Sequence, residues 1–381
     1  MVIKNRNLFR ITRFILLKLP LLFRFFARFR SPRKRLLIIK TDAIGDYVLF
    51  RNFIEVVKLS DRYKDYQIDL LGNTLWQELA LKYDAQFINQ FYFIRQYDLY
   101  EQPLKTLKSG WRLFRNNYEV VLQPSSTRLL ITDGLAALAA AKQLIGFESD
   151  NEGIPQRYKA KTDKFYTYRL ILPQNIYFEF DRSRFFFETV LKQVVELNGP
   201  AININTPNKR GIVIFPGAGI FKRGWEAEKF LTLIKLILAQ TSERVYLAGG
   251  PGEIAIGNYL EDNLPHQNVL NLTGKTSLPQ LVELIASAAL VIANETSAIH
   301  LAAATQTKAV CILGGGHFGR FAPYPESMQS RPECLYQKME CYNCNWDCIY
   351  KTSEKEPYPC IAIISLEEVW QVVQPLLLQN V

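Results

Sequence analysis

Short apolar runs alternate with segments of helical periodicity along most of this chain. Three such runs in the first half are predicted strands: residues 36–40, 68–71 and 120–123. Apolar residues recur at helical spacing in residues 47–59 and 131–141. Strands that alternate with helices in this way favour a parallel α/β domain, in which crossover helices cover the sheet.

The second half repeats the alternation and predicts a second α/β unit of similar size. Its predicted strands are residues 211–215, 244–248, 290–293 and 309–313. Its predicted helices are residues 227–238, 281–288 and 298–304, and a last helix that follows residue 365. Two of these helices follow a capping box, formed by Ser277 with Gln280 and by Ser365 with Glu368.

The boundary between the two halves is predicted from local polarity. A helix predicted at residues 183–197 is ended by Asn198-Gly199-Pro200, and the polar residues 203–210 then form a linker. The predicted parts are an N-terminal segment at 1–35, an N-terminal domain at 36–202, the linker, a C-terminal domain at 211–364 and a C-terminal helix at 365–381.

The positive charge of the chain is concentrated in its first 35 residues. The chain of 381 residues has a formal net charge of +10. Residues 1–35 contain eleven Lys and Arg residues and no Asp or Glu, which leaves 35 basic and 36 acidic residues elsewhere. A nearly neutral body lacks the basic face of a nucleic-acid-binding protein, so we do not expect nucleic acid as a partner.

The first 35 residues also have the pattern of a basic amphipathic helix. Its apolar positions, opposite a series of arginines, are Leu8, Ile11, Ile15, Leu22, Phe25, Phe26 and Phe29. Such helices lie in the membrane interface and are attracted to anionic lipid. The segment has neither the ~20 uncharged residues of a spanning helix nor a secretory-signal pattern. We therefore expect a cytoplasmic protein attached to the inner face of the membrane; alternatively, the helix packs on the chain's own body or on a second copy.

Five of the six cysteines lie near the end of the chain, whereas Cys311 lies in a predicted strand and packs as a small apolar residue. Cys341, Cys344, Cys348 and Cys360 offer the four thiolates that a structural zinc ion requires. The alternative is a set of reduced, partly buried thiols. Without a secretory signal, a disulfide framework is not expected.

The loop after the first predicted strand carries two carboxylates, Asp42 and Asp46. Gly45 would let the backbone turn tightly, and Asp46 would lie at or near the helix N-cap, where the dipole favours an ionised carboxylate. An ionised carboxylate at the mouth of a cleft can accept a proton from an attacking hydroxyl. The alternatives are a plain capping role for Asp46 and an exposed loop position for Asp42.

A glycine-rich loop, Pro-Gly-Ala-Gly at residues 216–219, opens the second α/β unit. Gly217 lets backbone N–H groups approach an anion, and Lys222 and Arg223 can neutralise a phosphate. After the next predicted strand, Glu253 can accept hydrogen bonds from ribose hydroxyls; its alternative role is to cap a helix.

A run of polar residues marks the point where strand 290–293 gives way to helix 298–304. In a doubly wound sheet, ligands bind at such points against the free N–H groups of a helix N-terminus. Thr296 and Ser297 can bind phosphate together with those N–H groups, and His300 can donate to the same anion. For His300, the alternative is a packed core position.

These motifs resemble, in order and spacing, those of the heptosyltransferases, glycosyltransferase family 9. The matching segments are residues 36–49, 216–225, 248–253 and 294–304. The resemblance covers most of residues 36–375. It implies a GT-B fold: two Rossmann-like domains that face a cleft, with an acceptor-binding N-terminal half and a nucleotide-sugar-binding C-terminal half.

The resemblance also implies an activity and residue roles. Members of the family transfer heptose from ADP-heptose to lipopolysaccharide core at the inner-membrane surface, with inversion and without a metal ion. By position, Asp46 matches the catalytic base, Arg223 the cation on the donor phosphates and Glu253 the contact to the donor nucleoside. The adjacent Lys222 can share the role of Arg223.

The loop that binds the diphosphate and sugar in the family corresponds to Glu295, Thr296, Ser297 and His300. The family usually has Asn-Asp-Ser/Thr-Gly before the helix, where this chain has Asn-Glu-Thr-Ser. Glu295 lengthens the carboxylate by one methylene, and Ser297 replaces a glycine. Both changes fall where the donor sugar is expected to bind.

We therefore expect an inverting glycosyltransferase that needs no metal or other cofactor. Its partners would be an ADP-linked sugar and a saccharide or glycolipid acceptor such as lipopolysaccharide core. One alternative is a nucleotide-sugar hydrolase or epimerase of GT-B fold, which would form its product without an acceptor. The other is a catalytically idle, membrane-associated binding protein.

Overall fold

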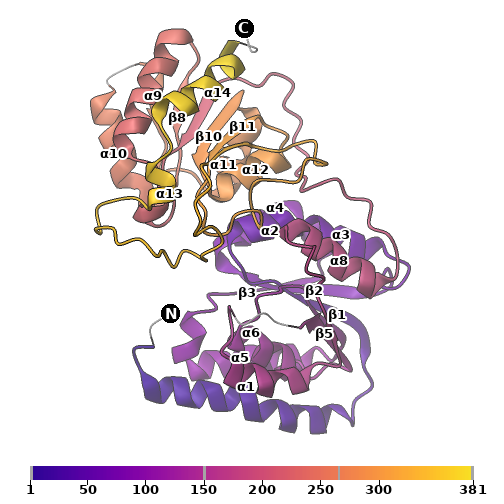
Figure 1. Ribbon diagram of the computed structural model, residues 1–381. Coiled ribbons are helices and arrows are strands. Elements are labelled where there is room, and N and C mark those ends of the chain that lie inside the picture. Colours follow the sequence, from indigo (N-terminus) through magenta and orange to yellow (C-terminus); the bar gives the residue numbers. More distant parts are fainter. Residues whose placement is uncertain (1–2, 149–151, 265–266, 379–381) are drawn as a thin grey trace. The chain divides into compact units, whose positions relative to one another are not determined.

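The computed structural model describes residues 3–148, 152–264 and 267–378. It divides into two compact units. The first unit comprises Met1–Ile176 and Phe180–Glu196, and the second comprises Tyr177–Glu179 and Leu197–Val381. Each unit is built on its own six-stranded parallel sheet, so the prediction of two Rossmann-like α/β halves is confirmed (Figure 1).

The sheet of the first unit has the order β3-β2-β1-β4-β5-β6. Its strands, in chain order, are β1 (Arg33–Ile39), β2 (Gln67–Asn73), β3 (Gln90–Ile94), β4 (Tyr118–Gln123), β5 (Gln143–Phe147) and β6 (Tyr168–Leu170). β1 pairs in parallel with both β2 and β4, and the direction of sheet growth reverses between β1 and β4. That reversal is the switch point at which α/β sheets bind ligands, beyond the carboxyl ends of the strands.

Helices cover both faces of this sheet. They are α2 (Ile44–Phe50), α3 (Asn52–Leu59), α4 (Gln77–Tyr83), α5 (Pro103–Arg115), α6 (Leu130–Leu138), α7 (Gln156–Thr162) and α8 (Glu179–Leu191), with 3-10 turns η1 (Thr74–Trp76), η2 (Ala85–Phe87), η3 (Asp98–Glu101) and η4 (Asp163–Phe165). Because neighbouring strand residues point to opposite faces, Leu37, Ile39 and Val121 pack with α5 and α6 in one core.

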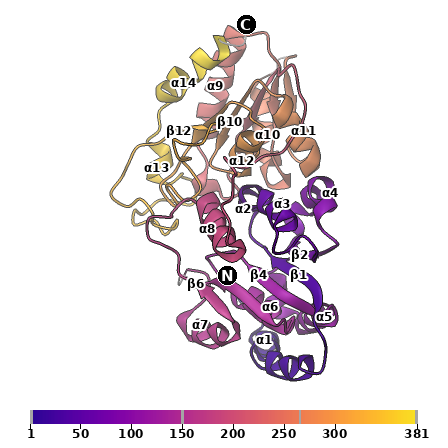
Figure 2. The ribbon, with the colours of Figure 1, turned by 90° about the vertical axis from the view of Figure 1, so that its right-hand side faces the viewer.

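The N-terminal segment forms one long helix, α1 (Arg6–Ala27), which continues through Pro20. Asn5 caps it, since its side chain accepts hydrogen bonds from the N–H groups of Asn7 and Leu8. α1 packs against α5 and α6, and Figures 1 and 2 both show it on the outer side of these two helices. Its buried residues are Thr12, Ile15, Leu16, Pro20 and Phe23. The helix therefore does pack on the chain's own body, through one of its faces.

The sheet of the second unit has the order β12-β11-β10-β7-β8-β9. Its strands are β7 (Ile212–Phe215), β8 (Val245–Leu247), β9 (Val269–Asn271), β10 (Leu290–Asn294), β11 (Ala309–Ile312) and β12 (Glu333–Leu335). Here the switch point lies between β7 and β10, which pair in parallel. The loops that follow these two strands contain the glycine-rich sequence and the polar run.

The helices of the second unit are α9 (Ala227–Gln240), α10 (Ile254–Asn263), α11 (Leu278–Ser287), α12 (Ser297–Ala304), α13 (Pro359–Ala362) and α14 (Leu366–Leu378), with 3-10 turns η5 (Phe221–Arg223) and η6 (Pro251–Glu253). Both predicted capping boxes are confirmed: Ser277 pairs with Gln280, and Ser365 with Glu368. The predicted linker at 203–210 lies on this unit, where Thr206 Oγ1 and the Arg210 N–H donate to carbonyls at the end of α11.

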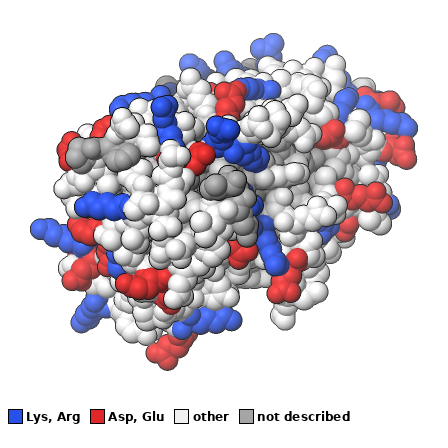
Figure 3. All heavy atoms as spheres, turned by 90° about the horizontal axis from the view of Figure 1, so that it is seen from above, with Lys and Arg blue, Asp and Glu red and all other residues white. Residues whose placement is uncertain are grey.

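Two surface properties bear on possible partners: the distribution of charge and the hydropathy of the helices. The face shown in Figure 3 carries basic and acidic side chains interspersed, as expected from the nearly neutral body. None of the helices in the described parts of the chain has both the length and the apolar character needed to cross a membrane.

Candidate functional site

The loop after β1 is fixed at the switch point of the first unit by a buried lysine. Lys40, which is 1% exposed, places its Nζ 2.8 Å from Asp42 Oδ2, and Ser125 Oγ, from the loop after β4, donates to the same oxygen at 2.6 Å. The Asp42 backbone carbonyl accepts from Trp76 Nε1 at 3.0 Å. Asp42 is therefore an anchor between two loops and not a solvated loop residue.

Asp46 lies in the first turn of α2 and is partly exposed. The predicted helix start at residue 47 was three residues too late, because α2 begins at Ile44 with Ala43 as its N-cap. Gly45 is consequently a helical residue, and the predicted tight turn there is wrong. Burial raises the pKa of Tyr97, and the nearby carboxylates of Asp42 and Asp46 raise it further.

The switch point of the second unit is organised by one side chain, Asn294, at the end of β10. Its Nδ2 donates to the carbonyls of Pro216, at 2.7 Å, and Gly217, at 3.2 Å, and its Oδ1 accepts from the Trp225 N–H at 2.9 Å. The amide thus joins the glycine-rich loop after β7 to the start of the polar run. These are the two loops that the sequence singled out.

The glycine-rich loop and Glu253 share a pocket of about 440 Å³. The glycine-rich loop and the loop that contains Glu253 line it, together with the first residues of α9 and α10 and with Lys355 and Pro357. A Cβ on Gly217 would meet Glu253 Cγ at 1.9 Å, so only glycine lets the carboxylate lie against this loop. Glu253 does not use its side chain to cap α10, although it occupies the N-cap position.

Arg223 and Lys222 are neighbours in η5, but their side chains have different partners. The Arg223 guanidinium lies 4.1 Å from the centre of the Trp346 ring, a cation–π contact. Lys222 Nζ donates to the carbonyl and hydroxyl of Thr352, both at 3.3 Å. The structure therefore holds the two cations through separate contacts.

Arg223 shares a buried region with Glu295. Burial lowers the pKa of Arg223 and raises that of Glu295 to about 7, and each charge partly offsets the effect of burial on the other. Among the described residues, neither Arg223 Nε nor Glu295 Oε2 has a hydrogen-bond partner. A buried donor and a buried acceptor left unsatisfied are costly unless a ligand completes them.

The raised pKa of Glu295 predicts how stability changes with pH. Its ordinary pKa is 4.5, so between pH 4.5 and 7 the unfolded chain loses this proton while the folded chain keeps it. The free energy of unfolding should therefore fall by up to ~3 kcal/mol as the pH rises through this window. In Glu295→Gln, which resembles the protonated acid, this component of the fall should vanish.

Thermal unfolding of the free protein at pH 5 and pH 8 measures the difference. Glu326→Gln is the matched control, because Glu326 is an exposed carboxylate of the same unit. It should keep the wild-type dependence on pH. Equal slopes for Glu295→Gln and the wild type would refute the assignment of a shifted carboxyl at this position.

Thr296 and Ser297 lie at the start of α12, as the sequence predicts. Thr296 is the N-cap, and its hydroxyl accepts from the Ala298 N–H at 3.3 Å. His300 is buried one turn later, with Nδ1 2.8 Å from the Tyr324 hydroxyl. Burial lowers the pKa of His300 to about 4, so the ring is neutral at physiological pH and brings no charge to an anion.

The structure places several residues at the two switch points that the sequence did not single out. In the first unit, Ser125 and Ser126 follow β4, and Arg182 Nη1 donates to Ser126 Oγ at 2.9 Å. In the second unit, Trp346 stacks on Arg223 from more than a hundred residues away. Of these residues, only the two serines lie in a sequence that could have marked them as a polar loop after a strand: Pro-Ser-Ser-Thr, after β4.

The late cysteines are free thiols in the structure. Cys341, Cys344 and Cys348 are partly exposed, and Cys360 is buried. Across the described residues, no group of three or more His, Cys, Asp or Glu side chains is arranged to hold a metal ion. The geometry therefore gives no support to the zinc interpretation of Cys341, Cys344, Cys348 and Cys360.

Comparison with known proteins gives one family. Residues 112–346, more than half of the chain, match the sequence profile of glycosyltransferase family 9 (heptosyltransferase). The chain is 27% identical over 173 residues to lipooligosaccharide heptosyltransferase 2 of Campylobacter jejuni, which is 44% of this chain and 51% of that protein. It is 29% identical over 130 residues to lipopolysaccharide heptosyltransferase 3 of Escherichia coli K12, 34% and 38% of the two chains. The chain spans about half the length of the first of these curated relatives and less of the second.

Solved structures resemble the chain over nearly its whole length. The E. coli ADP-heptose LPS heptosyltransferase II superposes with a TM-score of 0.66 over 91% of this chain and 99% of that one, at 16% identity. A glycosyl transferase family 9 protein of Veillonella parvula gives 0.71 over 92% and 99%, at 16% identity. E. coli WaaC with ADP-2-deoxy-2-fluoro heptose gives 0.64 over 90% and 99%, at 16% identity. At this identity the likeness concerns the fold, and the predicted GT-B class is confirmed.

Proposed function

The chain belongs to glycosyltransferase family 9, the heptosyltransferases, and from this membership we propose that it transfers a sugar from a nucleotide-sugar to an acceptor hydroxyl. The donor is a heptose-like sugar linked to ADP, and the acceptor is a saccharide or glycolipid such as lipopolysaccharide core. The observation that carries the proposal is that Arg223 Nε, a buried donor atom, and Glu295 Oε2, a buried acceptor atom, have no partner among the described residues and lie at a switch point.

In the proposed donor complex, the second unit binds the nucleotide-sugar. Glu253, which lines the 440 Å³ pocket, accepts hydrogen bonds from the ribose hydroxyls. Gly217 lets the loop approach the diphosphate, and Arg223 with the N-terminus of α12 supplies positive charge to it. Glu295 then faces the donor sugar, whose hydroxyls would donate hydrogen bonds to Glu295 Oε2.

The proposed reaction is a single displacement. Asp46 of the first unit removes the proton from the acceptor hydroxyl, whose oxygen attacks the anomeric carbon as the bond to the diphosphate breaks. One displacement inverts the configuration at that carbon. Negative charge that develops on the leaving diphosphate meets fixed donors at Arg223, Thr296 and Ser297, so no metal ion is needed for it. Proton NMR of the product tests inversion, and transfer in EDTA tests metal independence.

We propose further that the enzyme works at the cytoplasmic face of the membrane, attached peripherally through residues 1–35. α1 supports this, because its outer face leaves Phe25 and Phe26 about half exposed beside basic residues, and Phe29 in the turn that follows it is exposed as well. A glycolipid acceptor would be reached at that surface.

Arg223→Ala should weaken ADP binding by roughly 10–100-fold, because a charge-assisted hydrogen bond contributes about 1.5–3 kcal/mol. Lys222→Ala is the matched control and should weaken it less, since Lys222 Nζ is held by Thr352. Calorimetry with ADP, UDP and GDP measures both effects and the nucleotide preference.

The outcomes separate the alternatives. Preference for ADP together with product formed only when acceptor is present supports the transferase. Sugar released without an acceptor would identify a hydrolase. If no nucleotide bound, the catalytically idle, membrane-associated protein would be the favoured alternative. A larger loss from Lys222→Ala than from Arg223→Ala would contradict the assigned phosphate contact.

A further inference from the structure

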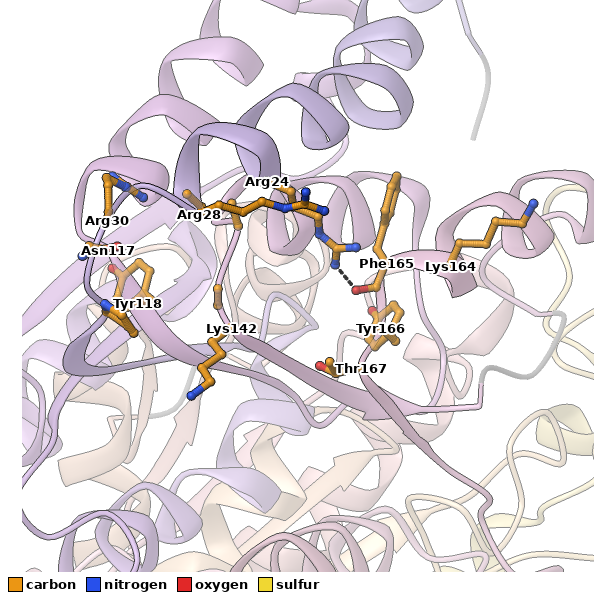
Figure 4. Close-up of a pocket in the computed structure, with 14 residues that line it drawn as sticks. Arg24, Arg28, Arg30, Asn117, Tyr118, Lys142, Lys164, Phe165, Tyr166 and Thr167 are labelled. Carbon is orange, nitrogen blue, oxygen red and sulfur yellow. Dashed lines mark hydrogen bonds between the residues drawn. The ribbon is translucent and has the colours of Figure 1, made fainter.

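A second pocket, of about 540 Å³, lies in the first unit away from the switch point. It is bounded by the end of α1, by the residues that follow α6 and by η4 with the residues after it (Figure 4). β4 and β5 begin beside it, at Tyr118 and Gln143, so it lies at the amino edge of the sheet. Asp46 lies beyond the carboxyl end of β1, at the other edge. The pocket is therefore distinct from the candidate catalytic loop.

The lining of this pocket is strongly cationic. Its charged members are Arg24, Arg28, Arg30, Lys142 and Lys164. No Asp or Glu is among the lining residues that the structure describes. Five cations without a carboxylate repel one another unless an anion joins them. A phosphate group is the anion that several arginines recognise best, since the guanidinium fork matches its oxygens.

Two of the arginines are held in place by backbone carbonyls. Arg24 donates to the Phe165 carbonyl, and both Nη atoms of Arg30 donate to the Phe114 carbonyl at 3.0 Å. The Arg30 guanidinium also lies 3.9 Å from the centre of the Phe114 ring. These contacts orient the guanidinium groups without neutralising them. Arg30 Nε is buried and has no hydrogen-bond partner within the described structure.

The other three cations are available to a ligand. Arg28, Lys142 and Lys164 are exposed. Their side chains make no ion pair or hydrogen bond with any residue in the described ranges. Figure 4 shows Arg24 and Arg28 extending from α1 toward the middle of the pocket, with Lys142 below them and Lys164 to the right. The pocket thus combines cations that are held by carbonyls with exposed cations, from three segments of the chain.

The outer face of α1 beside the pocket is apolar. Leu21, Leu22, Phe25 and Phe26 of α1, and Phe29 in the turn that follows it, are 48–75% exposed. On the neighbouring α5, Trp111 is 50% exposed and meets Phe23 edge-on. A contiguous apolar surface of this kind marks an interaction site. Aromatic residues beside cations are typical of a helix that lies in the membrane interface.

We propose that this pocket binds the phosphate headgroup of an anionic phospholipid while the outer face of α1 enters the interface. The charge of the lining is complementary to the headgroup, and the adjacent phenylalanines are complementary to the acyl region. The inference rests on the proposed membrane attachment and adds a defined headgroup site to it. It does not depend on sugar transfer.

The test is co-sedimentation of the full chain with vesicles of phosphatidylcholine alone or with phosphatidylglycerol added. Arg28→Gln/Lys142→Gln/Lys164→Gln removes the three available cations, and we expect it to weaken binding to anionic vesicles roughly 100-fold at low salt. Lys235→Gln/Arg244→Gln/Arg331→Gln changes the net charge equally with exposed residues of the second unit. It should bind like the wild type.

A second variant separates the pocket from the attachment itself. Phe25→Ser/Phe29→Ser should lose binding to both kinds of vesicle, because it removes the inserted side chains. Loss with this variant but not with the pocket triple would leave attachment standing and overturn the headgroup site. Equal loss in the two charge triples would mean nonspecific attraction and would also overturn it.

Two further outcomes concern other occupants. Wild-type binding that is equal on neutral and anionic vesicles would overturn the headgroup site. A dimer in solution that Phe25→Ser/Phe29→Ser dissociates, without vesicle binding, would assign the face to a second copy and overturn the proposal. Inorganic phosphate at the lipid-phosphate concentration should not displace the protein from anionic vesicles, since the headgroup acts together with the interface. Complete displacement would assign the pocket to free phosphate.

Discussion

Asp46→Asn should reduce sugar transfer by roughly 10²–10⁴-fold, the usual contribution of a positioned general base. The amide cannot accept the proton of the acceptor hydroxyl, although it keeps the size of the side chain. Because the donor is assigned to the other unit, the dissociation constant for ADP should not change. The measurement is kcat with saturating donor and acceptor, together with calorimetric titration of ADP.

The matched control for this variant is Glu55→Gln, an equivalent change at an exposed carboxylate of α3 in the same unit. It should transfer sugar at the wild-type rate. Transfer by Asp46→Asn within a few-fold of wild type would remove Asp46 from the role of base. Loss of ADP affinity together with activity would instead indicate a structural role.

The central part of each sheet was predictable because buried parallel strands leave continuous apolar runs. β1, β2, β4, β7 and β10 were all found in this way. The outer strands were harder, since they are short and partly exposed: β9 and β12 have three residues each, with intermediate or exposed positions. An edge strand buries only part of its surface, so it does not produce the run that identifies a strand.

The start of a helix was marked most clearly where a side chain caps it, although the start of α9 at Ala227 was found without such a cap. Ser277 and Ser365 both cap their helices as expected. α2 begins at Ile44 after Ala43, which has no capping side chain, so nothing in the sequence marked the start. Because the start was misplaced by three residues, Asp46 was predicted at or near the N-cap, whereas it lies in the first turn of α2.

The face of α1 that packs on the body could not be chosen from the sequence. The apolar face predicted from the sequence included Ile11, Leu22, Phe25 and Phe26, which are about half exposed in the structure. The body selects Ile15, Leu16 and Phe23, whereas Phe25 and Phe26 stay exposed. Which stripe is buried depends on the shape of α5 and α6, which the local pattern of α1 does not contain.

The candidate site was found from local motifs, but its geometry depends on distant residues. The sequence identified Arg223, Glu253 and Glu295 by their positions after strands. It did not indicate that Asn294 would bond to the glycine-rich loop, or that Trp346 would stack on Arg223. Those contacts form only when distant parts of the chain come together at the switch point, and the order of the strands in the sheet decides where that happens.

Arg128→Met should lower the free energy of unfolding of the first unit by roughly 3–5 kcal/mol, the cost of leaving a buried charge without its partner. Arg128 and Asp133 are both fully buried, and Nη2 lies 2.7 Å from Asp133 Oδ2. The guanidinium also donates to the Phe147 carbonyl at 3.0 Å and lies 4.1 Å from the centre of the Tyr166 ring. The pair joins the loop after β4 to α6 and β5, so its loss should also disturb Ser125 and the Asp42 anchor.

The double variant Arg128→Met/Asp133→Asn separates charge from packing. Without the arginine, Asp133 would be a lone buried carboxylate, and the amide removes that charge while still accepting from the Tyr166 hydroxyl, which lies 2.7 Å from Asp133 Oδ1. Chemical denaturation should therefore find the double variant more stable than Arg128→Met alone. Lys64→Met, which breaks the exposed pair with Asp61, should leave the unfolding midpoint unchanged. If the double variant proved no more stable than the single one, lost packing around Arg128, and not an unpaired charge, would be the cause of the destabilisation.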